Sequence, residues 1–598
     1  MKTIPAILVL VLFSFTLIFM DYHRRRPPAP GPDGCVSCHD RVSDPGPSHP
    51  VRVLGCAVCH MGNPYSLDRR RAHVGMVKNP GDLRVVDATC GTKGCHRDAA
   101  GRVRKSLMAT NRGILSTLQR QWLRLENPGT GVRRLMQQDP PENLALDHYR
   151  KMCGGCHLWK RRGDRRGEVG RRGGGCTDCH VPDTGPAGPA GQGPLRHPQI
   201  TTRIPPENCT KCHNRSARIG LSYFGRFESA GYGTPFERGS PGARRLSGGR
   251  FFIRLQADVH FKKAGMTCID CHTAAGLMGD GSEHEYMKDQ VDITCEACHR
   301  PSFSVVTDPE SPAKRLAFLN RKVPAVKGDR VAVSGKGTLL YNLRKQGTRT
   351  VLFRKMDGAP VVMTPSGGSD PYHGMPGHER LSCQACHSAW MPQCYGCHLT
   401  YDRSGRQKDW LDGRLSRGRW REARSYIRFS RPALGLGKDG RIFPVSPCQV
   451  FAAVFDENGR YRKRESFTSF SLSAFDPHTT ARASRDCLEC HLDPKTLGMG
   501  EGILRKKDGK WVLRSSYDAA ASSMGTDFPL DAFISPRGRR LKEFRGTGAR
   551  PFGGREISRI LSVAPCLGCH DRYDDRIYRD FRRSENRFET EPDLPCLK

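Results

Sequence analysis

The order of apolar and polar residues changes character along the 598-residue chain. An apolar run from Ile4 to Met20 stands first. From about Asp98 to Leu125 apolar residues then recur with helical spacing, and Pro128-Gly129 predicts where this helix has stopped. Within it, Met108 and Trp122 are expected to be packing residues.

Strand-like patterns lie in the second half of the chain. Four short β-rich runs, separated by Gly-containing turns, begin at Arg330, Thr338, Thr350 and Pro360. Hairpins are predicted at 451–461, around the turn 456–459, and at 503–513, around Asp508-Gly509. The pattern therefore predicts loops and short helices in the N-terminal half and β insertions in the C-terminal half.

Composition makes a conventional core doubtful for a chain of this length. Only 37% of residues are hydrophobic and 8% aromatic, against 65 Gly and 42 Pro, and the mean hydropathy is -0.57. These values exclude a polytopic membrane protein, and the length favours two or more domains. Something other than aliphatic side chains is expected to fill the interior.

The 26 cysteines indicate what could occupy the interior. Twenty-four of them form twelve close pairs, and His follows the second member of every pair. Eleven pairs have the spacing C-x-x-C-H, and the twelfth has four intervening residues. The motifs are Cys35/Cys38/His39, Cys56/Cys59/His60, Cys90/Cys95/His96 (the longer one), Cys153/Cys156/His157, Cys176/Cys179/His180, Cys209/Cys212/His213, Cys268/Cys271/His272, Cys295/Cys298/His299, Cys383/Cys386/His387, Cys394/Cys397/His398, Cys487/Cys490/His491 and Cys566/Cys569/His570.

C-x-x-C-H is the attachment motif of c-type haem. Two thiols three positions apart can reach both vinyl groups on one haem edge, and the adjacent His can ligate the iron. A tetrahedral zinc site does not require His after every second Cys, and a disulfide requires no His at all. We therefore expect about twelve covalently bound haems, with the cysteines fixing each ring and the motif histidines as proximal iron ligands.

Ten histidines lie outside the motifs, and His23 stands beside the N-terminal apolar run. The other nine are candidate second ligands, either for the motif that follows them or for a haem remote in sequence: His49, His73, His148, His197, His260, His284, His373, His378 and His478. Three irons are left without such a ligand. They could take Met76, Met499 or Met524, borrow a ligand from a partner subunit, or stay open to a small substrate.

Two cysteines remain outside the motifs, Cys448 and Cys596. In an oxidising compartment they could form a disulfide. Alternatively, Cys448 could be a free thiol, either unreactive or able to handle a soft oxyanion near an exposed haem.

Covalent haem attachment follows export, so an export signal is expected. The run from Ile4 to Met20 has no small-x-small cleavage site after it, which favours an uncleaved anchor on the periplasmic side of the inner membrane over a cleaved signal peptide. We expect an anchor or signal segment at 1–22, a Pro-rich linker at 23–34, a six-haem domain at 35–215 and a two-haem segment at 216–299. A haem-free β-rich insertion at 300–382 and a four-haem domain with β insertions at 383–598 would follow. The predicted fold class is a haem-organised α+β structure with little regular secondary structure.

The array resembles the large multihaem c-type cytochromes of metal- and oxyanion-respiring bacteria. The segment His378-Glu-Arg-Leu-Ser-Cys-Gln-Ala-Cys-His, the motif at Cys394, and Asp476-Pro-His-Thr-Thr before Cys487 are similar to cytochromes encoded beside selenite and tellurite reductases or electron conduits. The resemblance implies electron transfer from a quinol-linked membrane donor to a periplasmic, outer-membrane or extracellular acceptor. The alternative is a terminal oxyanion reductase, acting on selenite, tellurite, nitrite or a sulfur oxyanion at an open haem.

The formal charge of +37 and the pI near 9.7 would ordinarily suggest a nucleic-acid partner. Export removes that partner, so we expect no nucleic acid but other redox proteins, the membrane through the N-terminal segment, and a homo- or hetero-oligomer.

Overall fold

The computed structural model describes residues 33–593, apart from 41, 127, 164–168, 183–196, 215–218, 230–243, 246–250, 308–322, 367–370, 425–426, 518–528, 546–547 and 592. The expected anchor at 1–22 and most of the linker at 23–34 lie outside these residues. No helix among the described residues is long and apolar enough to cross a bilayer.

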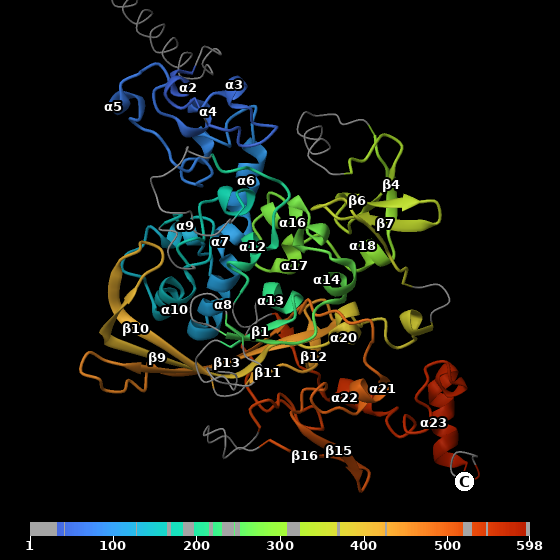
Figure 1. The fold of residues 1–598 in the computed structure, drawn as a ribbon. Helices are drawn as coiled ribbons and strands as arrows, with labels where there is room; N and C mark the ends of the chain where they lie inside the picture. Colours follow the sequence, from blue (N-terminus) through green and yellow to red (C-terminus); the bar gives the residue numbers. More distant parts are fainter. Residues whose placement is uncertain are drawn as a thin grey trace, which may run out of the picture.

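Short helices joined by loops make up the N-terminal half (Figure 1). The first of these helices form one end of the molecule, and α6 to α8 run from there into its centre. The elements are α2 Gly34–Cys38, α3 Val51–Leu54, α4 Ala57–His60, α5 Arg69–Ala72, η1 Val86–Ala88, α6 Arg97–Lys105, α7 Leu107–Thr110, α8 Arg112–Leu123, α9 Val132–Leu135, α10 Leu144–His148, the π-helix η2 Tyr149–Cys153, α11 Thr177–His180, α12 Pro206–Thr210 and α13 Ile219–Tyr223.

The helix predicted from about Asp98 to Leu125 is present but broken into three pieces. Ser106 leaves the helical region with ψ 153°, and Asn111 adopts the left-handed region with φ 46°, so α6, α7 and α8 are separate helices. Trp122 is buried in a cluster with Trp420 and Val450, and Met108 packs against a second cluster around Leu115. Both are packing residues, as predicted.

The middle of the chain contains a small sheet, five short helices and the predicted β-rich segment. The elements are β1 Arg226–Ser229, β2 Arg244–Arg245, β3 Phe251–Arg254, α14 Val259–Ala264, α15 Cys268–Cys271, α16 Ala274–Met278, α17 Met287–Gln290, α18 Glu296–His299, β4 Ser302–Val305, β5 Arg330–Val333, β6 Leu339–Gln346, β7 Arg349–Phe353, β8 Pro360–Val362 and η4 Pro371–Gly374. Strands β4 to β8 form one antiparallel sheet in sequence order, which confirms the four predicted runs and adds β4.

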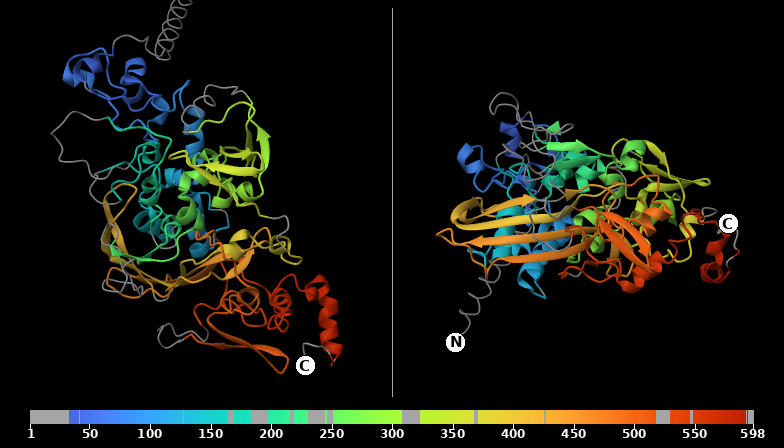
Figure 2. Two further views of the ribbon diagram at one scale, coloured as in Figure 1. Left: turned by 45° about the vertical axis from the view of Figure 1, so that its right-hand side comes forward. Right: turned by 90° about the horizontal axis from the view of Figure 1, so that it is seen from below.

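A larger sheet was not predicted. Its path is β10-β9-β13-β12-β17, with β11 also pairing β9 and β14 also pairing β13. Figure 2 shows its long strands lying beneath the helical half. The strands are β9 Gln393–Lys408, β10 Leu415–Arg424, β11 Ile427–Arg428, β12 Leu434–Gly437, β13 Ile442–Phe455, β14 Phe467–Ala474 and β17 Ala549–Arg550. Strands β9 and β13 are parallel neighbours although about 50 residues separate them, so local alternation could not indicate the pairing.

The remaining C-terminal elements are α20 Cys383–His387, α21 Cys487–His491, β15 Gly502–Lys507, β16 Lys510–Ser515, α22 Gly554–Leu561, η5 Arg576–Asp580 and α23 Phe581–Thr590. The hairpin predicted around Asp508-Gly509 is confirmed as β15 and β16, and both turn residues have positive φ, as a tight two-residue connection requires. In the other predicted hairpin the turn is present and Phe455 bridges Tyr461, but the main antiparallel partner of β13 is β14.

Buried apolar side chains form six separate clusters in the described part of the chain. The largest joins the C-terminal sheet to α22, and the next surrounds α6 to α8. The coarse expectation of a mixed α+β fold is therefore correct, with helices and several sheets in one chain.

Candidate metal centre

Seven motif histidines lie opposite a histidine from outside the motifs. Two imidazoles bound to opposite sides of one metal ion have ring centres about 6 Å apart, because each metal–nitrogen bond is about 2 Å and the ring centre lies about 1 Å further. The observed separations are 5.8 to 6.2 Å. The pairs are His39 with His73, His96 with His49, His60 with His197, His299 with His260, His272 with His478, His387 with His373 and His491 with His378.

The backbone leaves the Nε2 atom of these rings available for a metal. Nδ1 of His60 lies 2.7 Å from the carbonyl oxygen of Val77, and a carbonyl can only accept, so Nδ1 carries the proton. The same arrangement recurs at both kinds of position. Proximal examples are His180, His299, His387 and His491, and the outer examples are His73, His197, His378 and His478. Such contacts orient metal-bound histidines and fix their tautomer.

Two carboxylates have the same role but were not predicted. Asp258 accepts from Nδ1 of His260 at 2.8 Å, and Asp575 accepts from Nδ1 of His570 at 2.8 Å. The signal in the sequence was the short spacing between each Asp and its His, two and five residues. A carboxylate partner raises the basicity of the imidazole and strengthens it as a ligand.

Most motifs line one cavity of about 3730 Å³. Nine contribute all three of their residues to its wall, namely those that begin at Cys56, Cys90, Cys153, Cys176, Cys209, Cys268, Cys295, Cys383 and Cys487. Close-packed protein interiors leave few voids larger than a water molecule, so a continuous space of this size fits large prosthetic groups. The motifs at Cys35 and Cys566 do not line it, and Cys38 and Cys569 are exposed.

Neighbouring motifs touch one another, mostly in chain order. Asp178 and Lys211, from the loops between the cysteines of two motifs, form a buried ion pair at 2.5 Å. The thiols of Cys209 and Cys268 share a hydrogen bond. Further contacts are Asp33 with the amides of Cys35 and Cys56, Gln384 Nε2 with Cys295 Sγ at 3.7 Å, Arg485 N with Cys386 O at 3.0 Å, and Cys487 Sγ with Asp571 O at 3.5 Å.

The motif at Cys394 differs from the others because it lies in strand β9 and not in a helical turn. A bulge opposite Cys448 and Val450 of β13 brings Cys394 and Cys397 to one face of the sheet. His398 points to the other face, where its ring stacks on Phe451 with centres 5.4 Å apart. The structure therefore brings the two thiols together but not the thiols and their histidine, and the haem predicted at this motif stays a prediction.

Two of the nine candidate second ligands are not placed opposite a motif histidine. His284 points its Nε2 atom at Asp280, 2.9 Å away, so that nitrogen is engaged. His148 lines the cavity between the rings of Trp122 and Trp420, with centres 4.7 and 4.9 Å away, and burial lowers its pKa to about 4. It is therefore a neutral imidazole, suited to bind a metal but without a motif partner at ring distance. His23 lies outside the described residues.

The motifs at Cys153, Cys176 and Cys566 have no second histidine at ring distance among the described residues. Of the proposed methionines, Met499 is fully buried in the apolar C-terminal cluster, Met76 is 40% exposed, and Met524 lies outside the described residues. Met499 is thus a core residue rather than a ligand.

Cys448 lies directly opposite Cys394 in the register of β13 and β9, and it lines the cavity. Desolvation, with smaller contributions from Cys394 and Glu422, raises the pKa of its thiol although the side chain is accessible to solvent, so the thiol is protonated at neutral pH. A protonated thiol is a poor nucleophile and a poor metal ligand. The proposed disulfide partner, Cys596, lies outside the described residues.

No group of three or more His, Cys, Asp or Glu side chains surrounds a common point anywhere in the described part of the chain. A porphyrin supplies four ligands itself, and two imidazoles complete six-coordinate iron. The paired histidines, the free Nε2 atoms and the shared cavity therefore fit haem. No protein-family model, curated protein or solved structure matches this chain.

Proposed function

We propose that the protein is an exported multihaem c-type cytochrome that passes single electrons along about twelve covalently bound haems. The observation that carries this proposal is the set of seven histidine pairs with ring centres 5.8 to 6.2 Å apart. Each pair joins the histidine of a C-x-x-C-H or C-x4-C-H motif to one that follows no cysteine. Haem supplies the redox chemistry, and the protein sets potentials through ligands, burial and hydrogen bonds.

The contacts between motifs support transfer along the chain rather than twelve isolated sites. The Cys90 motif lies near those at Cys56 and Cys176, and the Cys268 motif lies near that at Cys295, since their thiols raise one another's pKa. Contacts join the motif at Cys35 to that at Cys56, join those at Cys176, Cys209 and Cys268, and run from Cys295 through Cys383 and Cys487 to Cys566. The first and last of these lie towards opposite ends of the molecule (Figure 1). Electrons would enter at the exposed Cys35 motif, from a quinol-linked membrane donor near the N-terminal segment. They would leave at the exposed Cys566 motif, to a periplasmic or outer-membrane acceptor.

The test is a haem count on the purified full-length protein. The expected pyridine haemochrome value is about twelve per chain, with a predominantly low-spin spectrum from the paired histidines. Alkylation of the denatured protein should reach only Cys448 and Cys596, because thioether bonds block the other cysteines. A count near zero, with all cysteines alkylated, would refute the proposal.

A further inference from the structure

One motif differs from the paired ones in burial, in charge and in its place in the array. His157, of the motif at Cys153, is only 4% exposed, and its Nε2 atom has no hydrogen-bond partner. It lines the central cavity together with Cys153 and Cys156. No second histidine faces it at ring distance within the described residues, which include every histidine of the chain except His23.

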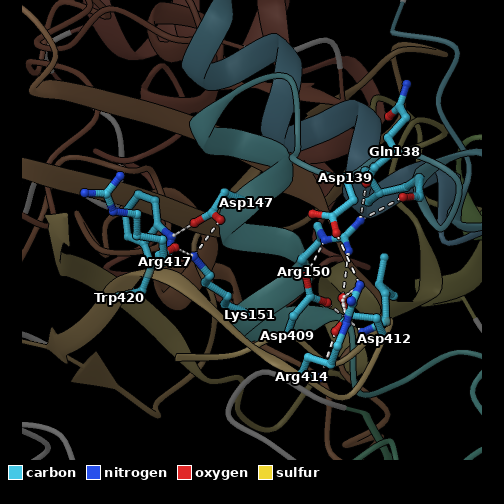
Figure 3. Close-up of polar contacts among 12 residues, drawn as sticks. Gln138, Asp139, Asp147, Arg150, Lys151, Asp409, Asp412, Arg414, Arg417 and Trp420 are labelled. Carbon is cyan, nitrogen blue, oxygen red and sulfur yellow. Dashed lines mark hydrogen bonds and ion pairs between the residues drawn. The ribbon is translucent and has the colours of Figure 1, made fainter. Parts of the chain in front are cut away.

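The segment that leads into this motif is fixed by a buried ionic network (Figure 3). Arg150 pairs with Asp409 and donates to the carbonyl oxygens of Leu135 and Gln138, at 2.8 and 2.7 Å. The neighbouring Lys151 pairs with Asp147 at 2.7 Å. These contacts tie η2 to α9 and to the turn that follows strand β9. A position built in this way is held rigidly, as a binding site requires.

Cationic side chains gather around His157 and Cys156. Arg172, which is 2% exposed, donates from Nη1 to Cys156 Sγ at 3.0 Å. Lys160 donates to the carbonyl oxygens of Arg161 and Arg172, at 3.1 and 3.4 Å. The charges of Lys160 and Arg84 also act on His157. These cationic groups favour a negative group in this part of the molecule.

The motif stands beside the chain of motif contacts rather than within it. The thiols of Cys156 and Cys212 share a hydrogen bond, so the Cys153 motif touches the Cys209 motif. The Cys209 motif also contacts its neighbours on both sides, through Asp178 and through Cys268. Electrons could therefore reach the Cys153 motif from the Cys209 motif. Transfer between the other motifs does not have to pass through the Cys153 motif.

We propose that the iron held by His157 keeps its sixth position open and binds a small inorganic anion, with Lys160 and Arg172 supplying the attracting charge. This inference rests on the proposed function, because it requires a haem at Cys153 and Cys156. It assigns a ligand class, small anions, to one motif of the array. The paired histidines leave seven other irons closed to such a ligand.

The experiment uses the full-length, haem-loaded protein and two probes. Azide is an anion and binds ferric iron, whereas carbon monoxide is neutral and binds ferrous iron. We expect both to change the haem spectrum, and the part of the azide response that belongs to the Cys153 iron is the part that Lys160→Met weakens. Lys160→Met should weaken azide binding about tenfold and leave carbon monoxide binding unchanged, because only the anion senses the lost charge. Lys160→Arg should keep the azide affinity.

Lys355→Met is the matched control. Lys355 donates to the carbonyl oxygen of His272, at 3.3 Å, and so stands beside a motif whose iron would have two histidines. This variant should bind azide as the wild type does. A full haem count and an unchanged low-spin signal show in each variant that the protein has folded and loaded.

Three results would overturn the inference. If the loaded protein does not respond to azide or to carbon monoxide, the site is closed and the cytochrome proposal stands. If azide binds but Lys160→Met and Lys355→Met behave alike, the open iron lies at another motif. A haem count near zero would instead refute the proposed function itself.

Discussion

A histidine ligates a metal only through a nitrogen that carries no proton, and its neighbours decide which nitrogen that is. In His73 the Nδ1 atom lies 2.7 Å from the carbonyl oxygen of Arg69, so Nε2 is the free atom. In His284 the Nε2 atom is the one engaged, by Asp280. His73 and His284 were both candidate ligands in the sequence, but in the structure only His73 has an Nε2 atom available for a metal.

This difference predicts the effect of removing each of them. In His73→Ala the iron at the Cys35 motif should lose its sixth ligand and become high-spin, because the ring opposite His39 is gone. The measurement is the electron paramagnetic resonance spectrum of the oxidised protein, with haem content as the loading check. His284→Ala is the control and should leave the spectrum unchanged. A larger high-spin signal in the control than in the wild type, or no increase in His73→Ala, would contradict this assignment of ligands.

Lys542, which belongs to none of the twelve motifs, should make the stability of the protein depend on pH. Burial lowers its pKa from 10.5 to about 7, and Asp531 opposes the shift only in part. Between about pH 7 and 10.5 the unfolded chain binds a proton that the folded protein does not, so this group makes stability rise with pH in that window. Below about pH 7 both states are protonated, and the folded state carries the full cost of a buried charge.

Lys542→Met should therefore raise the unfolding midpoint relative to the wild type near pH 6.5 and lose most of this advantage near pH 9.5. At high pH the neutral amine of the wild type still donates to Gln449 Oε1, which lies 2.8 Å away. Thermal unfolding of the loaded proteins across this range is the measurement. Lys510→Met, at the exposed hairpin turn, should show no such trend. A constant difference between wild type and Lys542→Met would show that Lys542 keeps its proton throughout.

Among the elements, α10 and η2 pack on strands β9 and β10 through the apolar cluster around Trp122 and Trp420, and a buried ion pair adds to this contact by joining Arg150 to Asp409 in the turn after β9. Both side chains of the Arg150 and Asp409 pair are nearly inaccessible, at 2% and 4% exposed. Removing one partner of such a pair leaves an uncompensated buried charge, which costs about 3–5 kcal/mol. An exposed pair contributes below about 1 kcal/mol.

Arg150→Met should therefore destabilise the protein by about 3–5 kcal/mol. Arg414→Ala is the matched change at the surface. Arg414 is 73% exposed and pairs with Asp412 and Asp139 at 3.1 and 3.2 Å, so its loss should cost below about 1 kcal/mol. Denaturant unfolding gives both values. The double variant Arg150→Met, Asp409→Asn should recover part of the loss, and the absence of any recovery would place the cost in packing rather than charge.

The elements also show which features a sequence can predict. The strands from Arg330 to Val362 were predictable because each pairs with its neighbour in the chain, so local alternation and turns specify them. The spacing of the twelve motifs can be read directly from the sequence, and the haems inferred from it stay a prediction. Strand β9 was not predictable, since its parallel partner β13 comes from a distant segment.

The partners of the histidines were beyond the sequence for the same reason. His478 precedes Cys487 by nine residues but faces His272, which lies 206 residues earlier. His260 stands just before Cys268 but faces His299. The sequence could name both as candidate ligands, because histidine is the residue that iron requires. Only the tertiary fold decides which ring each one opposes.

For the whole molecule, the modest apolar content and the large cavity fit one arrangement, in which groups other than aliphatic side chains fill the interior. The buried apolar side chains of the described residues are divided among six clusters, and motif residues from most of the chain meet in a space of about 3730 Å³. A chain whose interior is completed by attached groups needs fewer aliphatic residues of its own. Its folding should then depend on haem attachment, since the unloaded chain has no other filling for that space.

The same groups change the meaning of the charge of +37. In the proposed cytochrome each ferric haem with its two propionates would contribute about -1 and each ferrous haem about -2, so twelve haems would bring the protein to about +25 oxidised and about +13 reduced. The mobility of the loaded protein towards the cathode at pH 7 should therefore fall by about half on full reduction. Capillary electrophoresis under oxidant and under dithionite measures this change, with a basic protein that lacks redox groups as the control. An unchanged mobility after complete reduction would mean that each electron is accompanied by a proton, and the array would then carry hydrogen equivalents rather than electrons alone.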